Sequence, residues 1–580
     1  AAPPSIYTYS LDETRHVTIV AVSQLSNGSY IGVSADLYVR VTCPGSGHVY
    51  VETLPLSQID LQASTRVAAL AASSVANISF YSCDFYASIK SDSPIIGGPS
   101  ASGVTAVAFA AALLKLPLNE SIIMTGMVMP DGSIGPVGGL KYKLDAAASR
   151  GAKVFIVPYG QTRDTVYRVV AQRVGPTIIT RVVPEAVDLV SYGAQLNVLV
   201  IPVANIYEAL EIFTDKIYRV PPRDVRWLNR FSEIYTSLDT VQHEWISSLS
   251  SEISRALNES RAIEDRALST LSGYSSIYIR NLLQNIDSSI EGLKKQAETL
   301  ELSGKLYAAA STYLQALIYA YQRLHLLKAI IDGSYISQEA NTINSSIYKI
   351  IEYVNRYSVE NGIDVARLSI AINTLDRAYE ALIYVNRTLS SQYIDSASQY
   401  LALASARVYT ARLWSTLLGN PIYETAKSPQ ISVDDLNRMA LYISALAQNI
   451  YTYIVAFSSY TQTSSDVLSD AVYRYSLLFR VGEPLDRLAL GISSISYMHL
   501  ALVSMFLQDY NSTIEALNRT INVALSTLTS LDTPPIDIPL YIEMVKAFTS
   551  YPQTQIAMLS RLSIILSIYL SLIHISEPTR

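Results

Sequence analysis

Apolar residues change their spacing near residue 220, and this change divides the chain into two regions. Before it, short runs rich in β-branched and aromatic residues alternate with longer apolar segments at helical spacing. From residue 224 to about residue 569, almost every window repeats its apolar positions with the period of an α-helix. The pattern predicts an α/β domain over residues 1–220 and an all-α domain over residues 221–569, folded as a helical bundle or solenoid.

The first region is expected to contain mixed sheets with packed helices. The expected strands are residues 17–22, 37–42, 80–89 and 154–158. The expected helices are residues 62–74, 102–116 and 140–150. Residues 122–137 predict a hairpin that turns at Pro130-Asp131-Gly132-Ser133.

The second region has few helix-breaking residues. Gly, Asn and Pro interrupt the helical pattern near residues 332–333, 361–362, 419–421, 482–484 and 534–535. Roughly eight to eleven helices fit between these breaks, given typical helix lengths. Residues 562–569 are apolar but too short to cross a bilayer, so they indicate either the beginning of a membrane helix or the terminal helix of the bundle. Residues 570–580 read as the translation of a sequencing adaptor, which leaves a membrane anchor in a missing C-terminus as an expectation.

Composition narrows the class of protein. Hydrophobic residues make up 49% of the 580 residues and charged residues 16%, which indicates an ordered chain. The net charge of −6 is spread without a basic block, so a nucleic-acid partner is not expected. No Cys/His cluster has metal-ligand spacing, and neither a metal nor a cofactor is expected.

The polar residues favour an exported protein, at the cell surface or outside it, and a membrane anchor is a further expectation. Tyrosine occurs 41 times against 10 phenylalanines, and serine is abundant throughout. Cys43 and Cys83 form either one disulfide or two buried thiols. Asn-x-Ser/Thr sequons, a mild signal for glycosylation, lie at Asn27, Asn77, Asn119, Asn258, Asn344, Asn386, Asn511 and Asn518.

One serine and one lysine carry the most specific chemistry. Gly98-Pro99-Ser100-Ala101 places a hydroxyl before a nearly all-apolar helix, whose amino end offers N–H groups and a positive dipole to an oxyanion. A nucleophilic serine needs a base. Lys143 opens another predicted helix and can serve as that base if burial keeps its amine neutral. The alternative is that Ser100 or Ser102 is an ordinary helix N-cap and that the lysines are exposed.

Four ordered blocks then resemble the proteolytic domain of the Lon protease family, a family of Ser–Lys peptidases. The blocks are Gly98-Pro99-Ser100-Ala101, Ile123-Met124-Thr125-Gly126, residues 135–147 and Gly151-Ala152-Lys153-Val154-Phe155-Ile156-Val157-Pro158. The resemblance implies a Lon-type α/β fold for residues 1–220 and, in this family, assembly into a homo-oligomeric ring.

The resemblance also implies roles for particular residues. Ser100 matches the nucleophile, Lys143 the general base, and Thr125 a threonine near the dyad, while Gly98, Pro99 and Ala101 match the surrounding motif. Lys141 falls where the family requires no lysine. Gly97 and Met127 stand where acidic residues are common, which puts the tuning of the dyad in question.

The family's usual ATPase motif, Gly-x4-Gly-Lys-[Ser/Thr], does not occur in the 580 residues. We therefore expect an ATP-independent Lon-like serine endopeptidase that acts on peptides or unfolded proteins. The rival hypothesis is a catalytically silent Lon-like scaffold within a helical surface or envelope protein.

Overall fold

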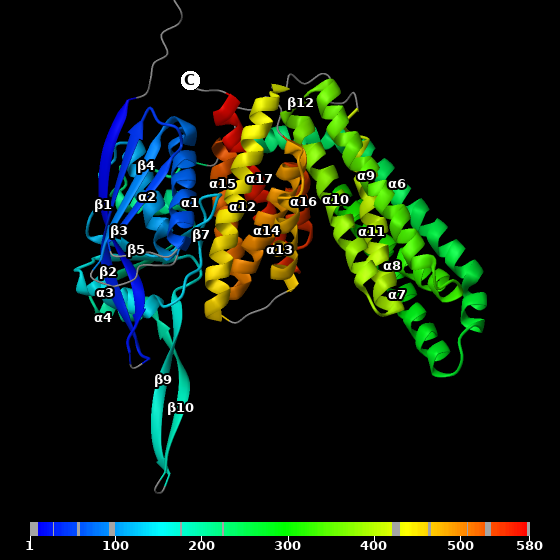
Figure 1. Cartoon of the computed structure of the whole chain (residues 1–580), viewed down its shortest axis with the longest axis horizontal. Coiled ribbons are helices and arrows are strands. Elements are labelled where there is room, and N and C mark those ends of the chain that lie inside the picture. Colours follow the sequence, from blue (N-terminus) through cyan, green and yellow to red (C-terminus); the bar gives the residue numbers. More distant parts are fainter. Residues whose placement is uncertain are drawn as a thin grey trace, which may run out of the picture.

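The computed structural model begins with a four-stranded sheet, shown in Figure 1. Its spatial order is β1 (Leu11–Gln24), β2 (Tyr30–Cys43), β4 (Asp84–Lys90) and β3 (Val49–Leu54), and only the β3–β4 pair is parallel. The structure describes residues 10–26, 28–54, 59–91, 99–174, 177–222, 226–419, 430–461, 466–506, 509–527 and 535–576.

One face of this sheet covers a helical layer. In β2, Leu37, Val39 and Val41 are buried whereas Tyr38 and Arg40 are exposed, because side chains alternate between the two faces of a strand. The buried face packs on α2 (Ser102–Leu113), and α1 (Ile59–Ala76) lies against α2. Every residue of α2 is buried, which explains why this helix is apolar on all sides.

A second sheet is parallel, and it contacts α2 through its strand β5. Its order is β11 (Leu199–Val203), β8 (Val154–Pro158) and β5 (Ile122–Met124). Three short helices accompany it, namely α3 (Leu140–Ser149), α4 (Leu189–Gln195) and α5 (Ile206–Phe213). The hairpin expected over residues 122–137 is correct only in its inner part, where β6 (Met127–Val128) pairs with β7 (Ile134–Gly135). β5 instead joins the parallel sheet through β8.

A long two-stranded ribbon was not predicted. β9 (Arg163–Val174) and β10 (Thr177–Asp188) pair in antiparallel register and project away from the rest of the domain (Figure 1). The sequence prediction missed this ribbon because its apolar residues do not alternate cleanly with polar ones.

The rest of the described chain is helical apart from one short strand pair, β12 (Ile363–Asp364) with β13 (Gln430–Ile431) (Figure 1). A first group, α6 to α11, contains the longest helix of the described chain, α6 (Arg226–Ser269). The others of this group are α7 (Tyr274–Leu302), α8 (Leu306–Ile331), α9 (Tyr335–Asn361), α10 (Val365–Ser390) and α11 (Ile394–Ser415). The second group is α12 (Val433–Thr461), α13 (Asp466–Leu478), α14 (Pro484–Phe506), α15 (Tyr510–Thr527), α16 (Asp537–Ala547) and α17 (Pro552–Ser576). These are twelve helices in the described parts of the region, slightly more than the sequence indicated.

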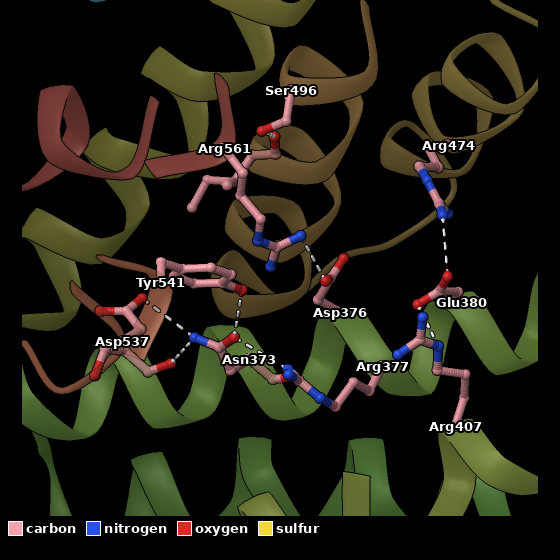
Figure 2. A network of polar contacts seen from close by, with 12 residues as sticks. Asn373, Asp376, Arg377, Glu380, Arg407, Arg474, Ser496, Asp537, Tyr541 and Arg561 are labelled. Atoms are coloured by element: carbon pink, nitrogen blue, oxygen red, sulfur yellow. Dashed lines mark hydrogen bonds and ion pairs between the residues drawn. The ribbon is translucent and has the colours of Figure 1, made fainter. Parts of the chain in front are cut away.

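Buried and half-buried charged residues between the two helical groups form the network in Figure 2. Arg561 pairs with Asp376 at 2.7 Å, and Arg407 and Arg474 pair with Glu380 at 2.8 and 3.7 Å. Buried ion pairs add little net stability, but breaking one leaves an uncompensated charge. The network therefore favours one packing of α10, α11, α13 and α17 over alternatives.

The helical region packs on the α/β domain through its second group, because α12 and α17 contact α1. Polar contacts strengthen this junction. The Ser563 hydroxyl of α17 donates a hydrogen bond to Asp131, and Arg519 of α15 pairs with Glu208 at 3.5 Å.

The structure confirms the expected fold class, an α/β domain followed by a large all-α region. It also bears on two open alternatives. Cys43 and Cys83 form a disulfide that ties the end of β2 to the beginning of β4. Residues 562–569 lie within α17, which packs on α14, α15 and α16 as a helix of the bundle. Among the described residues, no helix combines the length and apolarity that a membrane crossing requires.

Candidate active site

Ser100 lies in a single 3-10 turn, Pro99–Ala101, that leads directly into α2. Pro99 is buried, whereas Ser100 and Ala101 are half-buried. The Ser100 carbonyl accepts hydrogen bonds from the Gly126 N–H at 2.9 Å and from the Thr125 hydroxyl at 3.4 Å. The Thr125-Gly126 segment, which is distant in sequence, therefore fixes the position of this serine.

The interpretation of Ser100 or Ser102 as an ordinary N-cap is wrong. The cap position of α2 is Ala101, and no side chain caps this helix end. The Ser102 hydroxyl instead donates to the Pro99 carbonyl at 2.6 Å and accepts from the Val128 N–H at 2.9 Å. Ser102 thus joins the Ser100 turn to β6, which leaves the Ser100 hydroxyl without a capping role.

α2 approaches the Thr125-Gly126 segment closely. The Gly103 N–H donates to the Gly126 carbonyl at 3.0 Å, so this amide at the amino end of α2 is already engaged. A Cβ on Gly103 would lie 2.8 Å from the same carbonyl oxygen. Gly126 has a φ of +148°, and a Cβ there would lie 2.5 Å from Ile134. Glycine at both positions is what allows the two backbones to meet.

Lys143 is a buried lysine, with only 4% of its surface exposed. It belongs to the first turns of α3, and its N–H donates to the Gly139 carbonyl. Burial lowers the pKa of Lys143 to about 8, although the nearby Asp164 carboxylate acts to raise it. A substantial fraction of its amine is therefore neutral near pH 8 and able to accept a proton.

Lys141 is in a different electrostatic environment. Its ammonium pairs with Asp145 at 2.8 Å and lies near the rings of Tyr142 and Tyr192. Partial burial alone would lower the pKa of Lys141, but the hydrogen bond and charge of Asp145 raise it above the usual value. Lys141 therefore stays protonated where Lys143 begins to lose its proton.

Close packing fixes α3 against the first sheet. A Cβ on Gly32 of β2 would lie 1.8 Å from the Tyr142 carbonyl oxygen. Gly139 has a φ of +68°, and a Cβ at this position would lie 2.5 Å from the Val22 side chain of β1. The Ser100 turn also contacts β1. Ser100 and Lys143 thus lie on elements that both contact β1. No hydrogen bond joins these two described side chains.

Two residues that the sequence analysis did not identify hold the α3 segment in place. The Gln161 side chain accepts from the Val137 N–H at 2.9 Å and donates to the Val137 carbonyl at 3.0 Å. Asp164, at the base of β9, accepts from the Lys141 N–H at 2.8 Å. Only their position just after β8 connects them to the site, and sequence gives no other signal for either residue.

Four predicted positions remain to be placed. Gly97 and Gly98 lie outside the described residues, whereas Thr125 and Met127 are both buried. Thr125 is fully buried beside Ser100, and its N–H donates to the Ile156 carbonyl at 3.0 Å. Met127 is fully buried in β6, so an acidic side chain at this position would have to be desolvated. The catalytic assignment of Ser100 and Lys143 stays a prediction.

Comparison with known proteins identifies the α/β domain. The family described as "Lon protease (S16) C-terminal proteolytic domain" matches residues 71–183. Lon protease 1 of Hydrogenovibrio crunogenus is 42% identical over 67 residues, which cover 12% of this chain and 8% of that protein. Lon protease of Escherichia coli (strain K12) is 30% identical over 149 residues, which cover 25% of this chain and 19% of that protein.

The family match lies within the first domain and includes the Ser100 turn, the Thr125-Gly126 segment and the helix that carries Lys143. The aligned segments span less than a fifth of either relative. This chain contains a proteolytic domain of the Lon protease family.

Proposed function

We propose that this chain is a serine endopeptidase in which Ser100 is the nucleophile and Lys143 is the general base. The observation that carries the proposal is the burial of Lys143, which lowers its pKa to about 8 on a helix packed against the same strand as the Ser100 turn. A structural lysine gains nothing from being desolvated, whereas a base must be neutral to accept a proton.

In the proposed mechanism, the neutral Lys143 amine removes the Ser100 hydroxyl proton as the oxygen attacks the scissile carbonyl. Backbone N–H groups near the amino end of α2 would stabilise the oxyanion. The Lys143 ammonium then protonates the leaving amine, so the peptide C–N bond breaks and an acyl-enzyme remains. A water molecule, deprotonated by Lys143, hydrolyses the ester and restores Ser100.

We also propose that the substrates are peptides or unfolded proteins and that hydrolysis needs no ATP. The lack of a Gly-x4-Gly-Lys-[Ser/Thr] motif in the 580 residues supports this proposal. An exported location is part of the same proposal, and the Cys43–Cys83 disulfide supports it because disulfides persist in oxidising compartments.

The test compares Ser100→Ala, Lys143→Ala and the matched control Lys141→Ala in hydrolysis of unfolded casein and of a fluorogenic peptide, with and without ATP. We expect the first two variants to lose activity and the Lys141 variant to retain it. Circular dichroism establishes that all three are folded. Activity that survives Ser100→Ala or Lys143→Ala contradicts the dyad.

A fluorophosphonate probe separates the peptidase from the rival scaffold function. We expect the probe to label the wild-type protein at Ser100 and to leave Ser100→Ala unlabelled. A folded wild-type protein that hydrolyses nothing and takes up no label would favour the scaffold.

A further inference from the structure

β3 leaves one edge of the first sheet open. In the order β1-β2-β4-β3 it pairs with β4, and no described strand lies along its other edge. Lysine, proline or a bulge protects many sheet edges from pairing with another chain. β3 contains neither lysine nor proline, and its one charged side chain, Glu52, accepts a hydrogen bond from the Ser88 hydroxyl of β4 at 2.8 Å. The edge is therefore open to an extended chain.

The direction of the backbone groups shows which of them are free. The Phe85 N–H of β4 donates to the His48 carbonyl, directly before β3, at 2.8 Å. Backbone groups of successive residues point alternately to the two edges of a strand. Val49, Val51 and Thr53 therefore direct their N–H and C=O groups away from β4. None of these groups bonds to another described residue, so the edge presents three donors and three acceptors.

A groove along this edge gives an added strand room. It has a volume of about 780 Å³ and is lined by residues of the sheet, of α1 and of α12. A strand occupies about 3.3 Å along its axis, 4.8 Å between neighbours and 10 Å between layers, or roughly 160 Å³ per residue. The groove therefore accommodates roughly five residues, close to the 6 residues of β3.

The α12 wall of the groove offers a polar group that has no partner in the described chain. The amide nitrogen of Asn449 is buried there and makes no hydrogen bond. Thr452, one turn further along the same wall, is already engaged, because its hydroxyl donates to the Gln448 carbonyl at 3.0 Å. A buried donor without a partner is costly, so Asn449 indicates a ligand with an acceptor at this place, such as a peptide carbonyl.

An aromatic pair borders the groove on the outer face of the sheet. Tyr50 of β3 stacks on Tyr86 of β4 with 4.8 Å between ring centroids, and Tyr50 exposes 48% of its surface. An exposed ring contacts many kinds of side chain, and hydrogen bonds to a backbone do not depend on sequence. These features suit an unfolded chain of varied sequence better than a single defined partner.

We propose that a segment of an unfolded polypeptide adds to the free edge of β3 as a fifth strand, in the groove between the sheet and α12. The Ser100 turn contacts β1, at the opposite edge of the sheet. Three strand spacings separate β3 from β1, or about 14 Å, so the groove lies outside the candidate active site. A bound chain is thereby held close to the site of cleavage. This role in substrate capture rests on the proposed peptidase function, whereas the binding itself does not.

The first experiment blocks the edge with proline. Val51→Pro removes an N–H that points into the groove and breaks no bond to β4, a position that proline tolerates in edge strands. Val51→Ala is the matched control, because it shortens the same side chain and keeps the N–H. Fluorescence anisotropy of labelled unfolded casein, in a Ser100→Ala background that prevents cleavage, gives the dissociation constant. We expect Val51→Pro to raise it about tenfold relative to Val51→Ala. Equal constants overturn the proposal.

The second experiment tests the opposite wall. Asn449→Leu removes the unpaired amide and is expected to raise the dissociation constant of casein about fivefold. Thr452→Val is the control, because its hydroxyl is already bound within α12, and it should leave the constant unchanged. Equal effects of the two variants overturn the placement of the ligand between β3 and α12.

The third experiment changes the ligand and leaves the protein as it is, so it does not depend on the folding of a variant. A labelled decapeptide of alternating threonine and valine is compared with two N-methylated forms. Methylation of every second residue leaves the N–H groups of one peptide edge intact and should preserve binding. Methylation of every residue should weaken binding about tenfold, because no N–H remains for the edge of β3. Equal affinity of the fully methylated peptide overturns strand addition.

Hydrolysis assays separate failure of this proposal from failure of the proposed function. In the active protein, Val51→Pro should raise KM for casein and leave kcat/KM for a fluorogenic tetrapeptide unchanged, because a tetrapeptide at the Ser100 turn is too short to fill the groove as well. If the peptidase assignment fails, the wild type cleaves neither substrate, yet casein binding still reports on the edge. If the edge pairs with a second copy instead, Val51→Pro lowers the mass in solution without changing casein binding, which overturns the proposal.

Discussion

Replacing the buried Lys143 by methionine is expected to stabilise the protein at neutral pH. Burial lowers the pKa of Lys143 from 10.5 to about 8, which means that the folded state holds the proton less tightly than the unfolded chain does. At pH 7 both states are protonated, so the folded state carries the full cost of a buried ammonium. The difference between the two pKa values corresponds to roughly 3 kcal/mol, an upper limit for the gain on removing the charge.

The sign of the pH dependence follows from the same two values. Between about pH 8 and 10.5 the unfolded chain binds a proton that the folded chain does not, so wild-type stability rises with pH over this window. The advantage of Lys143→Met is therefore complete below about pH 8 and disappears near pH 10.5. Methionine has a similar length and no charge, which limits the contribution of altered packing.

The assay is calorimetric unfolding of Ser100→Ala and of Ser100→Ala/Lys143→Met at a series of pH values, since the inactive background prevents self-digestion. The matched control is Lys141→Met, because Asp145 raises the pKa of Lys141 and its removal should bring no stabilisation at neutral pH. If Lys143→Met destabilises the protein equally at pH 7 and pH 10.5, the reasoning about the buried amine is refuted.

Three further predictions concern catalysis and stability. Wild-type kcat/KM should rise about tenfold per pH unit below pH 8 and level off above it, because only the neutral Lys143 amine accepts a proton; a flat pH profile would exclude Lys143 as the base. Gln161→Leu should lower kcat at least tenfold and reduce thermal stability, since it leaves the buried N–H and C=O of Val137 unpaired; Gln161→Glu should be impaired as well, because it sets an acceptor oxygen against the Val137 carbonyl, and full activity of either variant would contradict this role. Cys43→Ser should cost up to about 4 kcal/mol of unfolding free energy, measured under non-reducing conditions, whereas an unchanged melting temperature would contradict a structural role for the disulfide.

The residues of the candidate site could be identified from local patterns, but their electrostatic states could not. The motifs around Ser100 and Lys143 lie in short contiguous blocks, so their resemblance to the Lon protease family pointed to both residues and to Thr125. The contrast between Lys141 and Lys143 depends on which side of α3 faces the protein interior and on the carboxylates that approach it from elsewhere in the chain. Asp164 and Gln161 were missed for the same reason, because each acts on a segment about 25 residues away.

What the sequence determined by itself is the change from α/β to all-α folding near residue 220 and the existence of the three helices α1, α2 and α3 in the first domain. These properties follow from local periodicity and from the conformational preferences of Gly, Pro and apolar runs. Only the tertiary structure decided that Cys43 meets Cys83, that residues 562–569 pack within a helical bundle, and that Lys143 is buried while Lys141 is not. The physical reason is that burial, pairing and pKa depend on contacts between residues far apart in the chain, and local spacing carries no record of them.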